Sequence, residues 1–168
     1  MATVTLKGDA ARTVGELPDI GSRAPDFELV GKGLEDMTLS DFRGFTVLMN
    51  IFPSLDTPVC AMSVRRFNSE SAGLPGVRVL CISADLPFAH GRFCETEGIE
   101  NVVNLSSFRS PDFGMDYGVS IMDGPLRGLL ARAVIVVDPD GMVVYRQLVP
   151  EISSEPDYEQ VLSFLGNR

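Results

Sequence analysis

The sequence predicts an α/β sandwich in which parallel strands are joined by helical crossovers and extended by an antiparallel hairpin. Two apolar runs suit strands covered on both faces, and each is followed by a segment with helix start and stop signals. A strong turn signal then separates two further apolar runs, and a stretch of helical periodicity closes the chain. Strands that alternate with helices in this way build a parallel sheet.

The first buried strand is predicted at residues 46–52, where apolar residues stand at consecutive positions and Pro53 ends the run. A helix should follow this strand. Thr57 is a natural N-cap, and Pro58 suits the first helical position because its missing N–H would have no partner there. Gly73 marks the expected end of the helix.

The second buried strand is predicted at residues 77–83 and the second helix at residues 86–97. Asp85 can cap the start of this helix, and Gly98 can terminate it. Gly91 lies in the helix interior, where glycine costs roughly 1 kcal/mol relative to alanine. We therefore expect a helix that unwinds easily.

An antiparallel hairpin is predicted at residues 131–137 and 142–149, because the Asp-Pro-Asp-Gly sequence between them is a strong turn signal. A closing helix should begin near Pro156, and residues 1–12 can form a hairpin packed on the rest. This order of elements is that of a thioredoxin-like three-layer sandwich with an N-terminal β-hairpin extension.

Composition narrows the class of protein. The chain has 168 residues, of which 45% are apolar and 22% charged, so we expect one domain over residues 1–168. With 14 basic and 23 acidic residues, the net charge of -9 gives no reason to expect nucleic acid or a membrane as partner. A signal peptide and a membrane-length apolar run are also lacking, which predicts a cytoplasmic protein.

Three cysteines, Cys60, Cys81 and Cys94, are too few for a secreted disulfide framework. The sequence has no Cys-x-x-Cys pair and no histidine cluster, so it predicts no metal site, and nothing in it calls for a cofactor. In a reducing compartment, a cysteine singled out by its surroundings is catalytic or simply buried.

Position decides which cysteine is activated, because only the thiolate is a good nucleophile. Cys60 stands three residues after the expected N-cap, where free N–H groups and the helix dipole favour an anion. Cys94 falls near the other end of its helix beside Glu95 and Glu97, so it should remain a thiol. Cys81 reads as a small core residue. A packing role is equally compatible with Cys60 taken alone.

Arg132 shifts this balance. Strand alternation places it on the same face as Val134 and Val136, and a cation on an apolar face needs an anionic partner. A thiolate at Cys60 would be that partner. Taken alone, an arginine at the exposed start of the strand, paired with a surface carboxylate, is the commoner arrangement.

The stretch Pro-Ser-Leu-Asp-Thr-Pro-Val-Cys at residues 53–60 resembles the active-site pattern of the peroxiredoxin family, and its Asp-Thr-Pro-Val-Cys form resembles the thiol peroxidase branch, an atypical two-cysteine group. The resemblance covers nearly the whole chain. It continues at residues 92–95, 116–119, 124–126, 130–134 and 155–158.

The resemblance implies a role for five residues. Cys60 resembles the peroxidatic cysteine and Cys94 the resolving cysteine, joined in one chain as a Cys60–Cys94 disulfide. Thr57 and Arg132 resemble the residues that hold thiolate and peroxide, and Pro53 the residue that shields the pocket. The implied activity is reduction of hydrogen peroxide or organic hydroperoxides for antioxidant defence, with thioredoxin as reductant, and the implied assembly is a homodimer.

Forming the implied disulfide needs a conformational change. The two Cα atoms must come within about 7 Å, yet the cysteines lie on different predicted helices. Gly91 makes the helix at residues 86–97 the easier one to open.

Other classes remain open on the sequence. A thioredoxin-fold redox sensor or binding protein could use the same disulfide as a switch. A cysteine hydrolase is weaker, because His90, expected on the helix surface, is the only histidine. Four apolar residues could line a pocket for alkyl hydroperoxides, although such residues more often belong to the core: Met62, Leu86, Phe88 and Met122.

Overall fold

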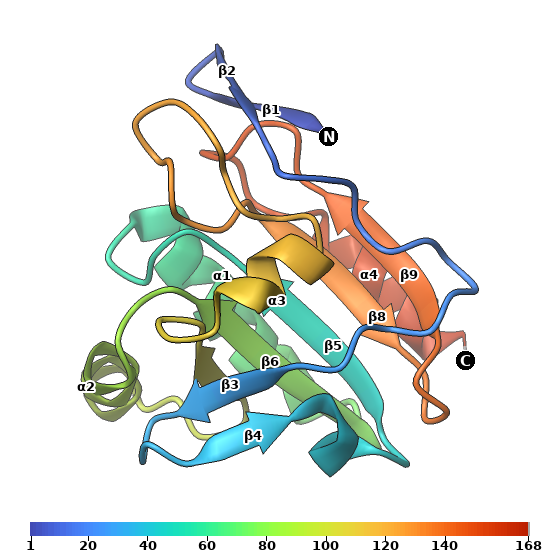
Figure 1. Ribbon diagram of the computed structural model, residues 1–168. Helices are drawn as coiled ribbons and strands as arrows, with labels where there is room; N and C mark the ends of the chain where they lie inside the picture. The colour runs from blue at the N-terminus through green and yellow to red at the C-terminus, as the bar shows by residue number, and fades with distance from the viewer. Residues whose placement is uncertain (168) are drawn as a thin grey trace.

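A seven-stranded mixed sheet forms the centre of the protein in the computed structural model, which describes residues 1–167 (Figure 1). The strands lie in the order β4-β3-β7-β6-β5-β8-β9. Their bounds are Glu28–Gly31 (β3), Asp36–Thr38 (β4), Thr46–Ile51 (β5), Val77–Ser83 (β6), Val103–Ser106 (β7), Ala133–Val137 (β8) and Val143–Leu148 (β9).

The middle of the sheet matches the prediction. β5 pairs in parallel with β6, and β6 with β7, whereas β8 runs antiparallel to both β5 and β9. The observed strands are one or two residues shorter at some ends than the predicted runs. Both faces of β5 and β8 are covered, which explains their uninterrupted apolar sequences.

Helices and loops cover the two faces of the sheet. One set of alternate strand residues packs against three helices, α1 (Pro58–Ser71), α2 (Pro87–Glu97) and α4 (Tyr158–Gly166). The other set packs against α3 (Pro111–Asp116), the 3-10 helix η1 (Leu39–Phe42) and the N-terminal segment. Figure 1 shows α3 in front of the sheet and α4 behind β8 and β9. The predicted three-layer sandwich is confirmed.

The helix ends test the predicted caps. Thr57 is the N-cap of α1 with extended backbone, and Pro58 is the first helical residue, as predicted. Gly98 ends α2 in the left-handed conformation with φ 66°, also as predicted. The N-cap of α2 is Leu86 and not Asp85. Because the Asp85 carboxylate is engaged elsewhere, as described below, the capping prediction is wrong.

The predicted N-terminal hairpin is present as β1 (Thr3–Leu6) and β2 (Asp9–Arg12). Its two turn residues, Lys7 and Gly8, both have positive φ, the geometry of a tight hairpin turn. The Glu151 carboxylate accepts hydrogen bonds from both of their N–H groups. The hairpin is therefore fastened to the segment that follows β9.

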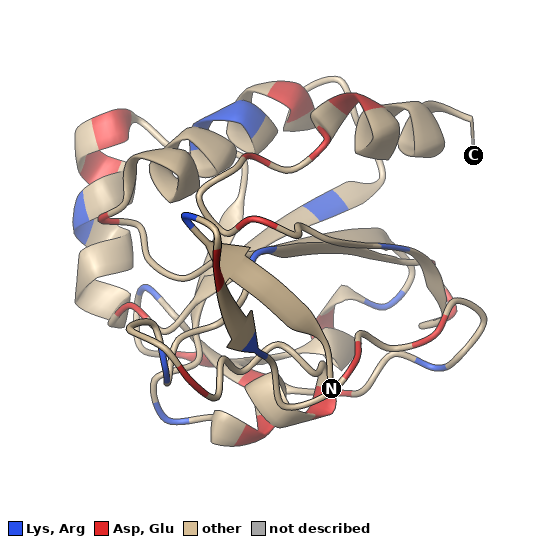
Figure 2. Ribbon diagram, turned by 90° about the horizontal axis from the view of Figure 1, so that it is seen from above, with Lys and Arg blue, Asp and Glu red and all other residues tan. Residues whose placement is uncertain are grey.

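Acidic and basic side chains are intermixed along the chain. Figure 2 shows the lysines and arginines dispersed among more numerous acidic residues instead of gathered on one face. Within residues 1–167, no helix has the length and apolar character that crossing a membrane requires.

Candidate active site

Cys60 lies at the point where the chain leaves the central strand β5 and enters α1. It is the third residue of α1, as predicted, and its side chain is completely buried. The N–H groups of this first helical turn have no partner within the helix, so the sulfur lies at the positive end of a 14-residue helix.

Arg132 is the residue just before β8, and its side chain reaches Cys60. Its Nη2 donates to Cys60 Sγ at 3.2 Å, and its Nε donates to the carbonyl of Ile152 at 3.0 Å. The side chain is only 1% exposed, and no carboxylate in residues 1–167 forms an ion pair with it. The alternative of a surface arginine paired with a carboxylate is therefore wrong.

One donor of this guanidinium is left over. Nη1 of Arg132 is buried and has no hydrogen-bond partner among the described residues. Buried N–H groups are nearly always paired, and unpaired ones mark a strained or functional position. The Cys60 site therefore contains a buried donor that no described residue uses, on the same planar group that contacts the sulfur.

Thr57 occupies the predicted N-cap position but does not cap with its side chain. Its hydroxyl instead donates to the carbonyl of Ser54 at 2.9 Å, and within residues 1–167 no hydrogen bond joins it to Cys60. Pro53 is buried at the end of the β5 segment. The structure thus places the Arg132 guanidinium in contact with the Cys60 sulfur, whereas the Thr57 hydroxyl bonds to the preceding loop.

Asp85 organises the loop before Cys60. Its carboxylate accepts hydrogen bonds from the Ser54 hydroxyl and the Leu55 N–H, both at 2.8 Å, and from the Ser83 hydroxyl at 2.6 Å. These three bonds explain why the carboxylate does not cap α2. Sequence reasoning missed this role, because two of its donors lie about 30 residues earlier in the chain.

Two buried polar side chains support the first turn of α1 through hydrogen bonds. The Ser63 hydroxyl donates to the Cys60 carbonyl at 2.7 Å, and Asn50 Nδ2 donates to Ser63 Oγ at 3.1 Å. Both residues are fully buried. The available signal was Asn50 itself, a polar residue within the otherwise apolar run of β5.

Cys94 lies in α2 and is buried. Asn104 Nδ2 donates to its sulfur at 2.8 Å, and burial raises the pKa of the Cys94 thiol. The raised pKa favours the thiol predicted for Cys94, and its main cause is burial and not the end of the helix. All three cysteines are free in this structure.

Cys81 is the core residue that the sequence predicted. It is completely buried in β6, and burial raises the pKa of its thiol to about 12. Asn50 Nδ2 is its nearest polar partner, at 3.7 Å. A thiol with this pKa is not a nucleophile near neutral pH.

His90 is not on the surface, so that prediction is wrong. Its side chain is 0% exposed, and its Nε2 lies 3.1 Å from the Ser83 hydroxyl. Burial lowers the pKa of the ring, against the opposing attraction of the nearby Asp85 carboxylate. The buried environment favours the neutral imidazole.

The four apolar residues expected in a pocket or in the core all lie outside the core, and one of them, Met122, lines an open cleft. Met62, Leu86, Phe88 and Met122 are all exposed, and Phe88 is the most exposed at 68%. They lie on the outside of the protein, where they are available to a partner.

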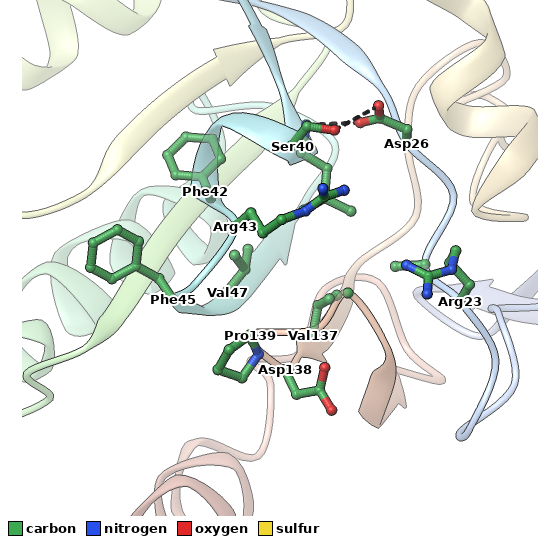
Figure 3. A pocket seen from close by; sticks show the side chains of 13 residues that line it. Arg23, Asp26, Ser40, Phe42, Arg43, Phe45, Val47, Val137, Asp138 and Pro139 are labelled. Carbon is green, nitrogen blue, oxygen red and sulfur yellow. Dashed lines mark hydrogen bonds between the residues drawn. The ribbon is translucent and has the colours of Figure 1, made fainter.

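A separate hollow of about 140 Å³ lies at the far end of the central strands (Figure 3). Val47 and Val137 line it, and these two residues pair four positions along β5 and β8 from Ile51 and Ala133. At about 3.3 Å per residue, this places the hollow about 13 Å from the end of the sheet nearest Cys60. The hollow is thus distinct from the Cys60 site.

Comparison with known proteins places this geometry in a family. The Redoxin family model matches residues 19–162. The thiol peroxidase of Mycobacterium bovis is 58% identical over 99% of both chains, and that of Corynebacterium glutamicum is 53% identical over 99% of this chain and 100% of the relative. The chain belongs to the thiol peroxidase branch of the peroxiredoxin family.

The fold of this thiol peroxidase agrees with a solved relative. The crystal structure of a peroxiredoxin-like protein from Aquifex aeolicus superposes with a TM-score of 0.94 and 43% identity, covering 99% of this chain and 97% of the other. Thiol peroxidases reduce peroxides with electrons from thiols, and this activity is favoured over the alternative of a redox switch that does not turn over peroxide.

Proposed function

We propose that Cys60 is the peroxidatic cysteine of this thiol peroxidase, that Arg132 activates it, and that Cys94 resolves the product. One observation carries the proposal: the buried contact of 3.2 Å between Arg132 Nη2 and Cys60 Sγ, beside an Nη1 donor with no partner. It brings a sulfur nucleophile, a cation and an unpaired hydrogen-bond donor together in one buried place.

Charge supports the reactive form of Cys60. A buried guanidinium without a compensating anion is costly, and Cys60 Sγ is the side-chain atom placed to carry that negative charge. The Cys60 thiolate attacks one oxygen of the hydroperoxide with an electron pair. The O–O bond breaks, the leaving oxygen takes the bonding pair and a proton from solvent, and Cys60 becomes a sulfenic acid.

The free Nη1 of Arg132 is the group suited to the peroxide. A peroxide oxygen that accepts from Nη1 is oriented beside the sulfur, and the positive guanidinium stabilises the charge that moves onto the leaving oxygen. Pro53, buried next to the loop, contributes to excluding water from this site. Thr57 acts through Ser54, by fixing the loop that leads into the first turn of α1.

Cys94 completes the oxidative half of the cycle. Its thiol attacks the sulfur of the Cys60 sulfenic acid, the Cys60–Cys94 disulfide forms and water leaves. Because Cys94 is buried against Asn104, it must leave this contact before it reacts. Unwinding of α2 supplies that movement.

The disulfide must be reduced before the next cycle. A dithiol donor attacks it, both protein thiols are restored, and the donor leaves as a disulfide. We propose thioredoxin as this donor and the cytoplasm as the compartment, since the cycle needs a continuous supply of reducing thiols.

We further propose that two copies of the chain associate as a homodimer. An open cleft of about 580 Å³ is lined by Phe108, Met115 and Met122, which are large apolar side chains with exposed surface. Exposed apolar groups that cluster in this way are typical of protein interfaces. Sedimentation should detect a dimer that Met115→Glu weakens, and a monomer at all concentrations would contradict the proposal.

A thioredoxin-coupled peroxidase assay tests the roles of the cysteines. Cys60→Ser should abolish peroxide reduction, whereas Cys94→Ser should keep one turnover and lose the continuing reaction. Cys81→Ser, a matched change of an unreactive buried thiol, should retain turnover. Loss of the first turnover in Cys94→Ser, or its survival in Cys60→Ser, would contradict the assignment.

A further inference from the structure

A chain of hydrogen bonds joins the helix that carries Cys94 to the loop that precedes Cys60. At the α2 end, His90 Nε2 lies 3.1 Å from Ser83 Oγ, and both side chains are completely buried. At the loop end, Ser83 Oγ lies 2.6 Å from the Asp85 carboxylate. The catalytic cycle described above uses none of these three side chains.

The direction of each bond follows from its donors. A carboxylate can only accept, so the single hydroxyl proton of Ser83 is donated to Asp85. Ser83 Oγ must then accept from His90, so the ring carries a proton on Nε2. Without the Ser83 hydroxyl, this buried N–H would lose its acceptor.

The loop end of the chain reaches the first turn of α1. The Asp85 carboxylate holds the hydroxyl of Ser54 and the N–H of Leu55. The carbonyl of Ser54 in turn accepts from both the hydroxyl and the N–H of Thr57, the N-cap residue of α1. One carboxylate is therefore shared between the Cys60 loop and the contact that ends at His90.

We propose that Ser83, Asp85 and His90 are positioning residues for the resolving step of the reaction. They hold α2 folded while Cys60 meets peroxide, and they release α2 when the Cys60 loop moves. This inference rests on the proposed function, because it assigns these residues to the transition between its two chemical steps.

The opening of the Cys60 loop and the opening of α2 are coupled because each breaks one end of the hydrogen-bond chain. A disulfide requires Cα atoms within about 7 Å, so the first turn of α1, the helix α2, or both must open. Opening of the loop removes two donors from Asp85, and opening of α2 removes the donor from Ser83. Because a partly satisfied buried network is unfavourable, the two openings should assist each other.

Ser83→Ala tests the link, because it cuts the chain while leaving Asp85 bonded to the Cys60 loop. Quench-flow with hydrogen peroxide, thiol alkylation and mass spectrometry follows sulfenic acid and disulfide separately. We expect an unchanged rate of peroxide reduction and disulfide formation about fivefold faster, the factor that one net hydrogen bond represents. Hydrogen exchange of α2 in the dithiol form should rise by a similar factor.

Two further variants separate positioning from general stability. Ser107→Ala removes another buried hydroxyl at the same corner, one that contacts the Ser83 carbonyl at 3.5 Å, and should leave disulfide formation unchanged. Ser83→Thr restores the hydroxyl and should restore the slower rate. Asp85→Asn weakens both ends, so it should slow peroxide reduction and speed disulfide formation.

Specific outcomes overturn the inference. Disulfide formation in Ser83→Ala at the wild-type rate or slower would do so, as would an equal effect of Ser107→Ala or a parallel loss of both chemical steps. If the wild type itself reduces no peroxide, the proposed function fails. The exchange of α2 in Ser83→Ala, measured without peroxide, still decides whether the link exists.

Discussion

Replacing Arg132 with alanine should slow peroxide reduction far more than any loss of thiolate explains. The substitution removes the Nη2 contact to Cys60 at 3.2 Å and the unpaired Nη1 together. Arg132→Lys is the matched control, since it keeps the positive charge and loses the planar pair of donors.

Ionisation of a thiol has a limited effect on its rate. For a cysteine in general, lowering the pKa from ~8.5 to ~6 raises the thiolate fraction at pH 7 by roughly 30-fold. With a Brønsted coefficient of ~0.45, the same shift weakens the nucleophile by roughly 13-fold, so the net gain is only about twofold. Loss of one preorganised donor to a transition state costs roughly 10²–10³. We therefore expect Arg132→Ala to slow the reaction by at least about 10².

The chain contains no tryptophan, so chemical quench replaces the usual fluorescence assay. Rates with hydrogen peroxide are measured by rapid quench and alkylation, and the thiolate fraction by ultraviolet absorbance against Cys60→Ser. Arg132→Lys should retain the Cys60 thiolate and still react at least about tenfold more slowly than wild type, because lysine lacks the planar pair of donors. If rate and thiolate fraction fall by the same factor in both variants, transition-state stabilisation by Arg132 is wrong.

Three other predictions follow from the structure. A Cβ at Gly91 meets no atom within 4 Å, so Gly91→Ala should stabilise α2 by about 0.5–1 kcal/mol. Disulfide formation, measured by quench-flow, should then be about two- to fivefold slower. An unchanged rate would contradict the hypothesis that α2 opens. Burial lowers the pKa of His90 in folded α2, so the contribution of this residue to the stability of α2 is complete above about pH 6.5 and declines as pH falls. Hydrogen exchange of α2, corrected for its intrinsic rate, should rise between about pH 7 and 5. His90→Gln should abolish this rise. Hydrogen bonds from Ser153, Thr5 and the hairpin turn hold the pKa of Glu151 well below its usual range. The stabilising effect of this carboxylate is therefore present above about pH 4.5 and is lost as pH falls through the lowered pKa. Glu151→Gln should raise hydrogen exchange of β1 and β2 at neutral pH, whereas unchanged protection would show that the carboxylate does not hold these strands.

The Cys60 site could be predicted because its signals are local. Thr57, Pro58 and Cys60 mark a helix start within four residues, and Arg132 stands out as a cation next to an apolar run. Neither signal gives a distance. Their meeting at 3.2 Å depends on the pairing of β5 with β8, which the order of elements only implied.

Two errors, at His90 and Asp85, share one cause, which is a polar residue whose partner lies elsewhere in the fold. His90 read as a surface residue because nothing near it in sequence indicates burial, and its acceptor, Ser83, lies on β6. Asp85 read as a helix cap, the ordinary use of aspartate before a helix, but three donors from the strand and the loop bind its carboxylate instead.

Four elements, β4, η1, β7 and α3, were not predicted from the sequence. β7 has only four residues, and two of them, Asn104 and Ser106, are polar and buried. A short strand of this composition does not show the apolar run on which the other central strands were recognised. Asn104 nevertheless donates to the sulfur of Cys94, so the surroundings of Cys94 were harder to predict than those of Cys60.

The N-terminal hairpin bears on how the protein should be handled in the laboratory. The carbonyl of Thr5 in β1 accepts from the N–H of Ile152, and the carbonyl of Ile152 accepts from Arg132 Nε, so two hydrogen bonds separate the hairpin from the Arg132 guanidinium. The end of α4 lies far from the hairpin in both ribbon views (Figures 1 and 2). We therefore expect an affinity tag before Met1 to disturb Arg132 more than a tag at the C-terminal end of the chain.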